Sequence, residues 1–129
     1  MASTNKVALD TNALTAIYLF KARVFEQIRE EIGKTEFAVP RQVLDELGKL
    51  AERNEKLKRA AKIAKELMEK NKVKVVEVEA NNADDALLKL SKGAIIATND
   101  KRLKKKIIEK GGRVFFLRQK KFLEINERF

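Results

Sequence analysis

The stretch KVALDTN at residues Lys6–Asn12 decides the fold. Its apolar run is short and ends at an acidic residue, and a helical pattern begins immediately after it. We therefore interpret it as a buried strand followed by a helix. The helical pattern continues to about Ile32, with a break near Lys21, and Gly33 ends it.

The rest of the chain alternates between apolar strands and amphipathic helices. Because the central strands are apolar on both sides, the alternation predicts a mainly parallel sheet with helices on both faces. Pro40, the only proline, is expected in the first turn of a helix. We predict strands at Lys6–Asp10, Glu36–Val39, Val73–Val78, Ala94–Ala97 and Arg113–Leu117. We predict helices at Asn12–Ile32, Arg41–Ala51, Glu55–Lys70, Ala83–Ser91 and Lys101–Lys110.

Length and composition indicate one domain that spans residues 1–129. The chain has 129 residues, of which 44% are apolar and 37% are charged, enough for one hydrophobic core and too few for two. We expect the core at about 6–117 and a basic extension at 118–129. No apolar run approaches the roughly 18 residues of a membrane span, and Met1–Lys6 lacks the apolar stretch of a secretory signal. We therefore expect no membrane contact and a cytoplasmic location.

Two absent residue types narrow the chemistry. The chain has no cysteine and no histidine, which excludes disulfides, thiolate nucleophiles, imidazole bases and the usual structural zinc sites. Serine occurs only at Ser3 and Ser91, and without histidine neither can form the familiar catalytic triad. An enzyme with this composition would use carboxylates, lysines or a hydroxyl as its working groups. Carboxylates bind hard cations through oxygen, and Mg²⁺ is the usual cation when the substrate is a phosphate.

The positive charge is concentrated in the last quarter of the chain. The formal net charge is +10, and Lys101–Phe129 holds eleven Lys and Arg against three Glu, a surplus of eight. A patch of this kind attracts polyphosphate backbones. The alternative is the Lys- and Glu-rich surface of a heat-adapted protein.

Two acids follow predicted strands. Asp10 ends the first strand, and Asp100 follows the apolar strand Ala94–Ala97. Ligands of open parallel sheets bind beyond the carboxyl ends of the strands, where both acids are expected. Both also fit ordinary capping of the next helix, so the two interpretations stay open.

Two further acids are placed by helical geometry. At 100° per residue, Glu46 lies about 90° from the centre of the apolar stripe of its helix, whereas Asp45 faces solvent. Asp84 lies about 50° from the inward face defined by Ala83, Leu87, Leu88 and Leu90. We therefore expect Asp84 to be buried, which demands a cation or several hydrogen-bond donors, and helix capping is the alternative. Asp85 is expected in solvent or in a supporting role.

Four acids at one edge of the sheet would repel one another. At a separation of about 4 Å and an effective dielectric near 20, each pair repels by roughly 4 kcal/mol. Such a cluster is tolerable only if cations neutralise it, and a divalent metal is the natural candidate.

Four segments together resemble the ordered motifs of PIN domains, over about Lys6 to Leu117. They are VALDTN at 7–12, VPRQVLDEL at 39–47, ADDALL at 83–88 and ATND at 97–100. The chain looks most like the small archaeal PIN proteins, which are related to VapC-type toxin nucleases and to PIN nucleases of ribosomal RNA processing. One departure is the helix after Asp84, which is shorter than is usual in the family.

The resemblance implies a three-layer α/β/α fold with a central sheet of about five strands, and a pocket that binds Mg²⁺ or Mn²⁺. It implies RNA as substrate, and a second copy of the chain (a homodimer) and a small antitoxin protein as candidate partners. Asn12 and Thr98 match residues that support the site, to which we add Asp85. The catalytic and metal-binding positions fall on Asp10, Glu46, Asp84 and Asp100.

The hypothesis is a ribonuclease that hydrolyses single-stranded RNA with a metal-activated water. A basic run directly after Asp100 is expected to hold the RNA backbone, and stacking on Phe115, Phe116 or Phe122 would be a minor contribution. Two alternatives remain: a Mg²⁺-dependent phosphoryl-transfer α/β protein, and a non-catalytic RNA-binding or assembly subunit. The basic run is Lys101, Arg102, Lys104, Lys105 and Lys106.

Overall fold

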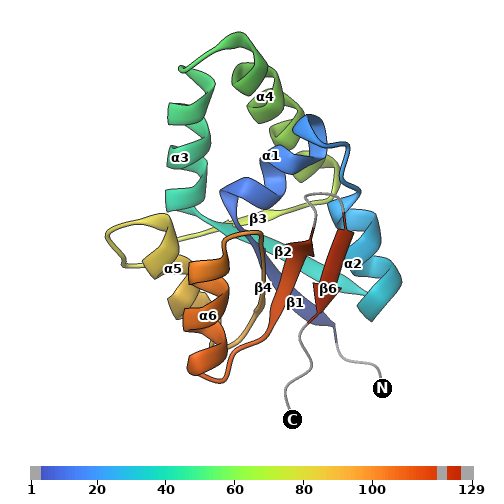
Figure 1. Ribbon diagram of the computed structural model, residues 1–129, viewed down its shortest axis with the longest axis vertical. Coiled ribbons are helices and arrows are strands. Elements are labelled where there is room, and N and C mark those ends of the chain that lie inside the picture. The colour runs from blue at the N-terminus through green and yellow to red at the C-terminus, as the bar shows by residue number, and fades with distance from the viewer. Residues whose placement is uncertain (1–3, 119–121, 126–129) are drawn as a thin grey trace.

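The strands in the described part of the chain join in one sheet (Figure 1). The computed structural model describes residues 4–118 and 122–125. The strands are β1 (Asn5–Leu9), β2 (Thr35–Pro40), β3 (Lys74–Val76), β4 (Ile95–Thr98), β5 (Val114–Arg118) and β6 (Phe122–Ile125). Their order is β3-β2-β1-β4-β5-β6; the first five run parallel, and β6 is antiparallel to β5. The predicted parallel sheet of about five strands is confirmed, with one antiparallel strand added at its edge.

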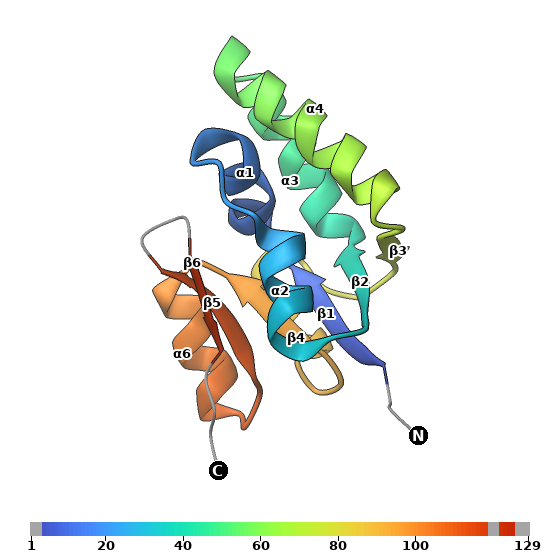
Figure 2. The same cartoon turned by 90° about the vertical axis from the view of Figure 1, so that its right-hand side faces the viewer.

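The helices cover both faces of the sheet. They are α1 (Thr11–Leu19), α2 (Val24–Ile32), α3 (Arg41–Ala51), α4 (Glu55–Lys70), α5 (Ala83–Leu90) and α6 (Lys101–Glu109). Helices α5 and α6 contact one face, and α1 and α2 contact the other. Helices α3 and α4 pack on α1 and extend beyond the ends of the strands (Figure 2). The three-layer α/β/α architecture is confirmed.

Local differences from the prediction have identifiable causes. The expected break near Lys21 is present, and this residue has a positive φ of 57°. Pro40 is not in the first helical turn; it is the last residue of β2 and the N-cap of α3, with ψ of 152°. Strand β3 is shorter than predicted because the Gln42 side-chain amide donates to the carbonyls of Val78 and Ala80, so this backbone pairs with a side chain.

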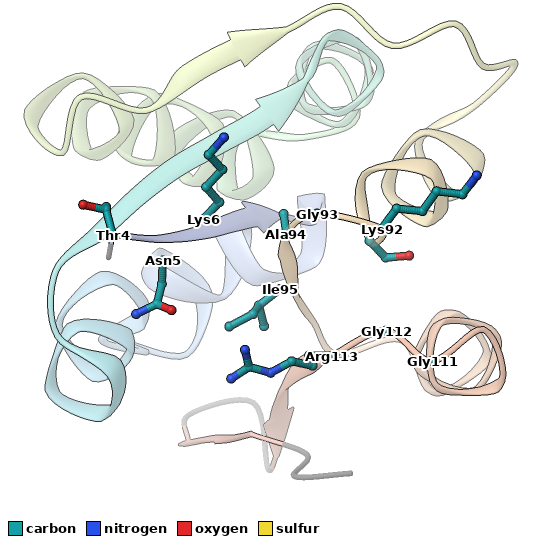
Figure 3. A pocket seen from close by; sticks show the side chains of 11 residues that line it. Thr4, Asn5, Lys6, Lys92, Gly93, Ala94, Ile95, Gly111, Gly112 and Arg113 are labelled. Atoms are coloured by element: carbon teal, nitrogen blue, oxygen red, sulfur yellow. The ribbon is translucent and has the colours of Figure 1, made fainter. Parts of the chain in front are cut away.

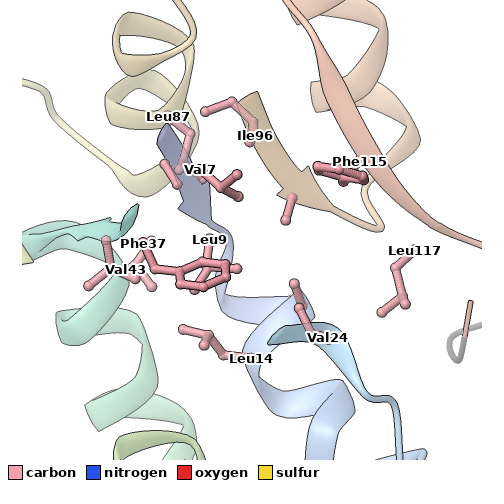
Figure 4. Close-up of a cluster of buried hydrophobic side chains, with 14 of the residues drawn as sticks. Val7, Leu9, Leu14, Val24, Phe37, Val43, Leu87, Ile96, Phe115 and Leu117 are labelled. Carbon is pink, nitrogen blue, oxygen red and sulfur yellow. The ribbon is translucent and has the colours of Figure 1, made fainter. Parts of the chain in front are cut away.

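The hydrophobic core lies on both faces of the central strands (Figure 4). Val7 and Leu9 on β1 and Ile96 on β4 are fully buried, as expected for parallel strands covered on both sides. Leu14, Val43 and Leu87 bring α1, α3 and α5 into the same cluster. This packing fixes the edge of the sheet at which β1 and β4 end.

Strand β1 is central and pairs with β2 on one side and β4 on the other. The chain moves from β1 toward β3 and then returns to β4, so the strand order reverses between β1 and β4. Ligands of open parallel sheets bind beyond the carboxyl ends of the strands at such a reversal. Asp10 and Asp100 follow β1 and β4 at this edge.

Two further expectations from the sequence concern a membrane span and the C-terminal extension. Among the described residues, no helix has both the length and the apolar content that crossing a membrane requires. Within the extension 118–129, Phe122–Ile125 forms β6, which contacts α2. Residues 119–121 and 126–129 lie outside the described residues, and the division into a core and an extension stays a prediction.

Candidate active site

Asp10 is a buried carboxylate at the junction between β1 and α1. Only 4% of it is exposed. Its Oδ1 accepts a hydrogen bond from the Thr11 amide at 2.7 Å, and its Oδ2 accepts one from Thr98 Oγ1 at 2.6 Å. The pKa of Asp10 is raised to about 6. Burial is the largest cause, the two hydrogen bonds act against it, and the negative charges of Asp84 and Glu46 add to the rise.

Thr98 connects the two acids that follow the strands. It is fully buried at the end of β4. Its hydroxyl donates to Asp10 and accepts a hydrogen bond from the Asp100 amide at 3.0 Å. Thr98, predicted as a supporting residue, thus connects the end of β1 with the end of β4 through its side chain.

Asp100 caps α6 and remains partly exposed. Its Oδ1 accepts from the amides of Arg102 and Leu103, so the capping interpretation is confirmed for this residue. Asp10 is likewise the N-cap of α1. Capping does not occupy the whole carboxylate, because no hydrogen bond to Asp100 Oδ2 occurs within the described part of the chain. That oxygen is available to a ligand.

Glu46 and Asp84 reach the same edge from α3 and α5. Partial burial raises the pKa of Asp84, and the charges of Asp100 and Glu46 raise it further, whereas Lys106 lowers it. Asp10 feels the charges of Asp84 and Glu46. Asp84 therefore lies within electrostatic range of the other three predicted acids, and Glu46 lies within range of Asp10 as well. We call them the acid rim: Asp10, Glu46, Asp84 and Asp100.

The prediction that Asp84 is buried is wrong. Asp84 is an exposed residue in the first turn of α5. The buried face of α5 consists of Ala83, Ala86 and Leu87, whereas Leu88 is only half-buried. With the face centred on these three residues, Asp84 lies about 110° from its centre. Asp84 therefore has no need of a cation for its own burial. Its capping alternative is also wrong, because Asn82 caps α5.

Two residues that the sequence analysis did not single out position the helix acids. The Asn82 side chain accepts from the Asp85 amide at 2.8 Å and fixes the first turn of α5. The Gln42 amide donates to the carbonyls of Val78 and Ala80, which ties the segment before α5 to the helix that carries Glu46. An Asn directly before a predicted helix is a capping signal, so Asn82 could have been found from the sequence.

A small cavity borders the acid rim. Its volume is about 230 Å³, and it lies between α3 and the start of α5. Glu46, Asp45 and Asn82 are among the residues that line it. The exposed oxygens of Glu46 thus face a hollow that can admit water or part of a ligand.

The acids have the right chemistry to bind a divalent metal, although their side chains do not converge into a complete metal site. Carboxylate oxygens are the preferred ligands of Mg²⁺ and Mn²⁺, and no ion pair among the described residues involves the acid rim. However, no three acidic side chains within residues 4–118 and 122–125 converge into a group that could hold a metal. The prediction of a tight cluster is therefore wrong for these side chains.

The predicted supporting residues differ in their contacts. Asn12 is exposed, and its carbonyl accepts a hydrogen bond from Thr15 Oγ1. Asp85 is exposed and lies on the far side of α5 from its buried face, as expected. Thr11, which the sequence analysis did not single out, is fully buried, and its Oγ1 has no hydrogen-bond partner among the described residues. Its hydroxyl is an unused polar group directly beside Asp10.

The predicted RNA-binding residues all lie on α6, which starts at the rim. Lys104 packs against β5, with its Nζ 4.3 Å from the centre of the Phe116 ring. Phe115 is only 1% exposed, so a base cannot stack on it. Phe116 is partly buried beneath Lys104, and the side chain of Phe122 lies outside the described residues. The exposed members of the basic run are Lys101, Arg102, Lys105 and Lys106.

Comparisons with known proteins agree on one family. The family model described as "PIN like domain" matches residues 7–120. The chain is similar to "Ribonuclease VapC4" of Methanocaldococcus jannaschii, with 36% identity over 127 residues that cover 93% of this chain and 95% of the relative. It is also similar to "Ribonuclease VapC9" of Archaeoglobus fulgidus, with 39% identity over 129 residues that cover 94% of this chain and 93% of the relative.

Solved structures show the same fold at lower sequence identity. The structure of the PIN domain endonuclease Utp24 matches with a TM-score of 0.76 and 23% identity, covering 95% of this chain and 92% of that one. A domain of a functionally unknown protein from Methanocaldococcus jannaschii matches with a TM-score of 0.62 and 19% identity, covering 98% and 99%. From the family model and the two ribonuclease relatives, we conclude that this chain belongs to the PIN-like domain family.

Proposed function

We propose that this protein is an endoribonuclease that hydrolyses phosphodiester bonds of single-stranded RNA with Mg²⁺ or Mn²⁺. Asp10, Glu46, Asp84 and Asp100 are the proposed metal-binding and catalytic residues. The names of its relatives support nuclease activity. The observation that carries the proposal is the electrostatic coupling of these four acids at the strand reversal, with a pKa of about 6 for the buried one.

The chain places its acids so that a cation is favoured beside them. Asp10 is the fixed member, because burial and two hydrogen bonds hold its carboxylate in one position. Glu46 and Asp84 are exposed and make no hydrogen bond through their carboxylates in the described part of the chain, so they are free to turn toward Asp10. A bound divalent ion would lower the pKa of a water ligand and polarise the phosphate.

The remaining residues orient the substrate. Thr98 keeps Asp10 and Asp100 in register. Asn12 is exposed one turn from the rim and can donate to a phosphate oxygen, and Asp85 can orient a water. The exposed cations of α6 neutralise the RNA backbone, which contributes affinity without sequence selectivity. The proposed biological role is that of a VapC-type toxin with a small antitoxin partner, or a role in RNA processing, in either case as a cytoplasmic protein and possible homodimer.

One observation favours the non-catalytic alternative. Since no three acids among the described residues converge on one point, Asp10 and Asp100 could serve only to cap helices while α6 binds RNA. The phosphoryl-transfer alternative has less support. Both oxygens of Asp10 already accept hydrogen bonds, and only 4% of the residue is exposed, so it is a poor nucleophile.

Replacing Asp10 with Asn separates these functions. The substitution keeps the shape of the side chain and removes its charge. We expect cleavage of labelled single-stranded RNA to require Mg²⁺ or Mn²⁺ and to fall by more than about 100-fold in Asp10→Asn, since loss of residues that only support a metal already costs up to that factor. Binding of the same RNA should remain within a few-fold of the unaltered protein.

Glu66→Gln is the matched control. It removes one negative charge from an exposed position on α4, outside the acid rim and the cavity beside it, and we expect it to cut RNA at the normal rate. RNA that is bound but never cut with either ion would support the binding subunit and end the nuclease proposal.

A further inference from the structure

A row of cations leads along α6 away from the acid rim. Arg102, Lys106 and Lys110 follow one another at intervals of four residues, which places them on one side of the helix with a rise of about 6 Å per step. All three are exposed. The Arg102 amide donates to the Asp100 carboxylate, so the row begins beside the rim. Lys106, the next member, lies close enough to Asp84 to lower the pKa of that carboxyl.

The row ends in a cavity of about 550 Å³ between the last turns of α5 and α6. We call it the α5–α6 cavity. Lys92 and Lys110 line it, together with the turn at Gly111 and Gly112. Lys89 also lines it, but its ammonium donates to the carbonyl of Glu79. The acidic residue among its lining is Asp85, on the side nearer the rim.

A second cavity adjoins the first. Its volume is about 450 Å³, and it lies at the amino ends of β1, β4 and β5, where it shares Lys92 and the glycine turn with the α5–α6 cavity. Figure 3 shows the guanidinium of Arg113 extending toward Asn5, whereas Lys92 extends the opposite way, past the end of α5. Arg113 therefore lines the second cavity alone, whereas Lys92 lines both.

The turn between the cavities depends on its glycines. Gly111 has a positive φ of 81°, which favours glycine. A Cβ at Gly112 would lie 2.6 Å from Ile107 Cγ2 and 3.2 Å from the Ile107 carbonyl oxygen. The turn thus lies directly against α6, and this close approach shapes the wall that both cavities share.

None of these cations forms an ion pair with an acid in the described part of the chain. The ion pairs there join Arg23 to Glu30, Arg41 to Glu77 and Lys74 to Glu36. Neither the α6 row nor the two cavities contribute to any of them. Unpaired cations that line a hollow indicate an anionic ligand.

We propose that the α5–α6 cavity binds phosphates of an RNA strand that passes over the acid rim, with Lys92 and Lys110 as their ligands. Arg113 then contacts the next phosphate in the adjoining cavity. This proposal rests on the proposed function, since it assigns a path to the same substrate. The regular spacing of Arg102, Lys106 and Lys110 along α6, with Lys92 and Arg113 in the cavities at its end, suits a chain of repeating phosphates, whereas a free phosphate ion needs several donors converging on one point.

The salt dependence of RNA binding tests the proposal. Affinity of the full chain for poly(U) would be measured at several salt concentrations in the presence of a chelator, which prevents metal-dependent cutting. Each phosphate contact to a single strand contributes about 0.7 to the slope of log affinity against log salt. The double variant Lys92→Gln/Lys110→Gln is therefore expected to lower this slope by about 1.4, and Lys92→Arg/Lys110→Arg is expected to keep it.

Lys62→Gln/Lys65→Gln is the matched control, because it removes two exposed charges from α4, away from both cavities. It should leave the slope unchanged. An unchanged slope in the Lys92/Lys110 variant would overturn the cavity proposal, even if RNA is cut normally. A lowered slope in a protein that never cuts RNA would instead support the cavity and remove the nuclease. Equal binding of polyglutamate, lost in the same variant, would identify an acidic peptide as the ligand and overturn the proposal.

Discussion

Asp10 and Asp84 are aspartates at the same rim, yet the protein holds them in opposite ways. Asp10 is 4% exposed and bound by two hydrogen bonds. Asp84 is exposed in the first turn of a helix and makes no side-chain hydrogen bond within the described residues. Asp10 is held in place, and the burial of its charge costs stability. Asp84 can move, and its exposed position costs almost none. The comparison suggests that one residue sets the position of the site and the other completes it.

The largest expected effect on stability comes from ionising Asp10. Its pKa is raised in the folded protein from about 3.8 to about 6. The folded state therefore holds this proton more tightly than the unfolded chain does, so the contribution of Asp10 to the free energy of unfolding is greatest below about pH 4 and is lost as the pH rises through about 6. The loss should be on the order of 3 kcal/mol. Chemical unfolding in a chelator, measured from pH 4 to pH 8, would show it.

Asp10→Asn isolates this effect from other titrating groups. The variant should be more stable than the unaltered protein above about pH 6 without metal, and nearly equal to it at pH 4. If the free energy of unfolding had the same pH dependence in both proteins, the ionised carboxylate of Asp10 would not destabilise the fold.

Removing the Thr98 hydroxyl should have the next largest effect. Thr98→Val keeps the shape of the buried side chain but takes one hydrogen bond from Asp10 and one from the Asp100 amide. Leaving buried polar groups unsatisfied costs about 1–3 kcal/mol. Thermal unfolding at neutral pH should show this loss, and Thr98→Ser should restore most of it. A Val variant as stable as the Ser variant would show that the hydroxyl contributes nothing.

A smaller effect is expected at Asn82. Its side chain caps α5, and replacing an Asn cap with Ala costs about 1 kcal/mol. Asn82→Ala should also loosen the turn that carries Asp84 and so weaken the binding of Mn²⁺, measured by calorimetry. Asn82→Asp retains a capping oxygen and should keep the stability. Full metal affinity in the Ala variant would show that Asp84 needs no help from the cap.

The smallest effect on stability is expected at Asp84 itself. Asp84→Asn alters an exposed residue, so the free energy of unfolding should stay within about 0.5 kcal/mol of the original value. The same variant should lose RNA cleavage if Asp84 completes the metal site. A large change in stability would contradict the contrast with Asp10.

The sequence predicted the fold closely where the pattern was long and periodic. Helices Arg41–Ala51 and Glu55–Lys70 begin and end where the periodicity places them. Prediction was less accurate where a side chain from a distant part of the sequence binds the backbone. The run Val73–Val78 has strand composition throughout, but Gln42 binds the carbonyls at its end, and no local pattern reveals that contact.

The candidate site was predictable at the strand ends and less so on the helices. Asp10, Thr98 and Asp100 lie where the strand boundaries place them, because the register of a parallel sheet fixes both ends at once. Asp84 was misplaced because the inward face of α5 was estimated from its leucines. Ala86 is fully buried and shifts the buried face away from Asp84, and a small residue carries little weight in a hydrophobic pattern.

The Thr98 hydroxyl has a single proton, and the structure gives that proton to Asp10 while the oxygen receives the Asp100 amide. A change at the carboxylate, through protonation or a bound ion, must therefore alter the polarity of the oxygen that the amide meets. The amide proton of Asp100 therefore reports on Asp10. Its NMR chemical shift should follow the charge of this carboxylate, which follows β1 and is almost completely buried.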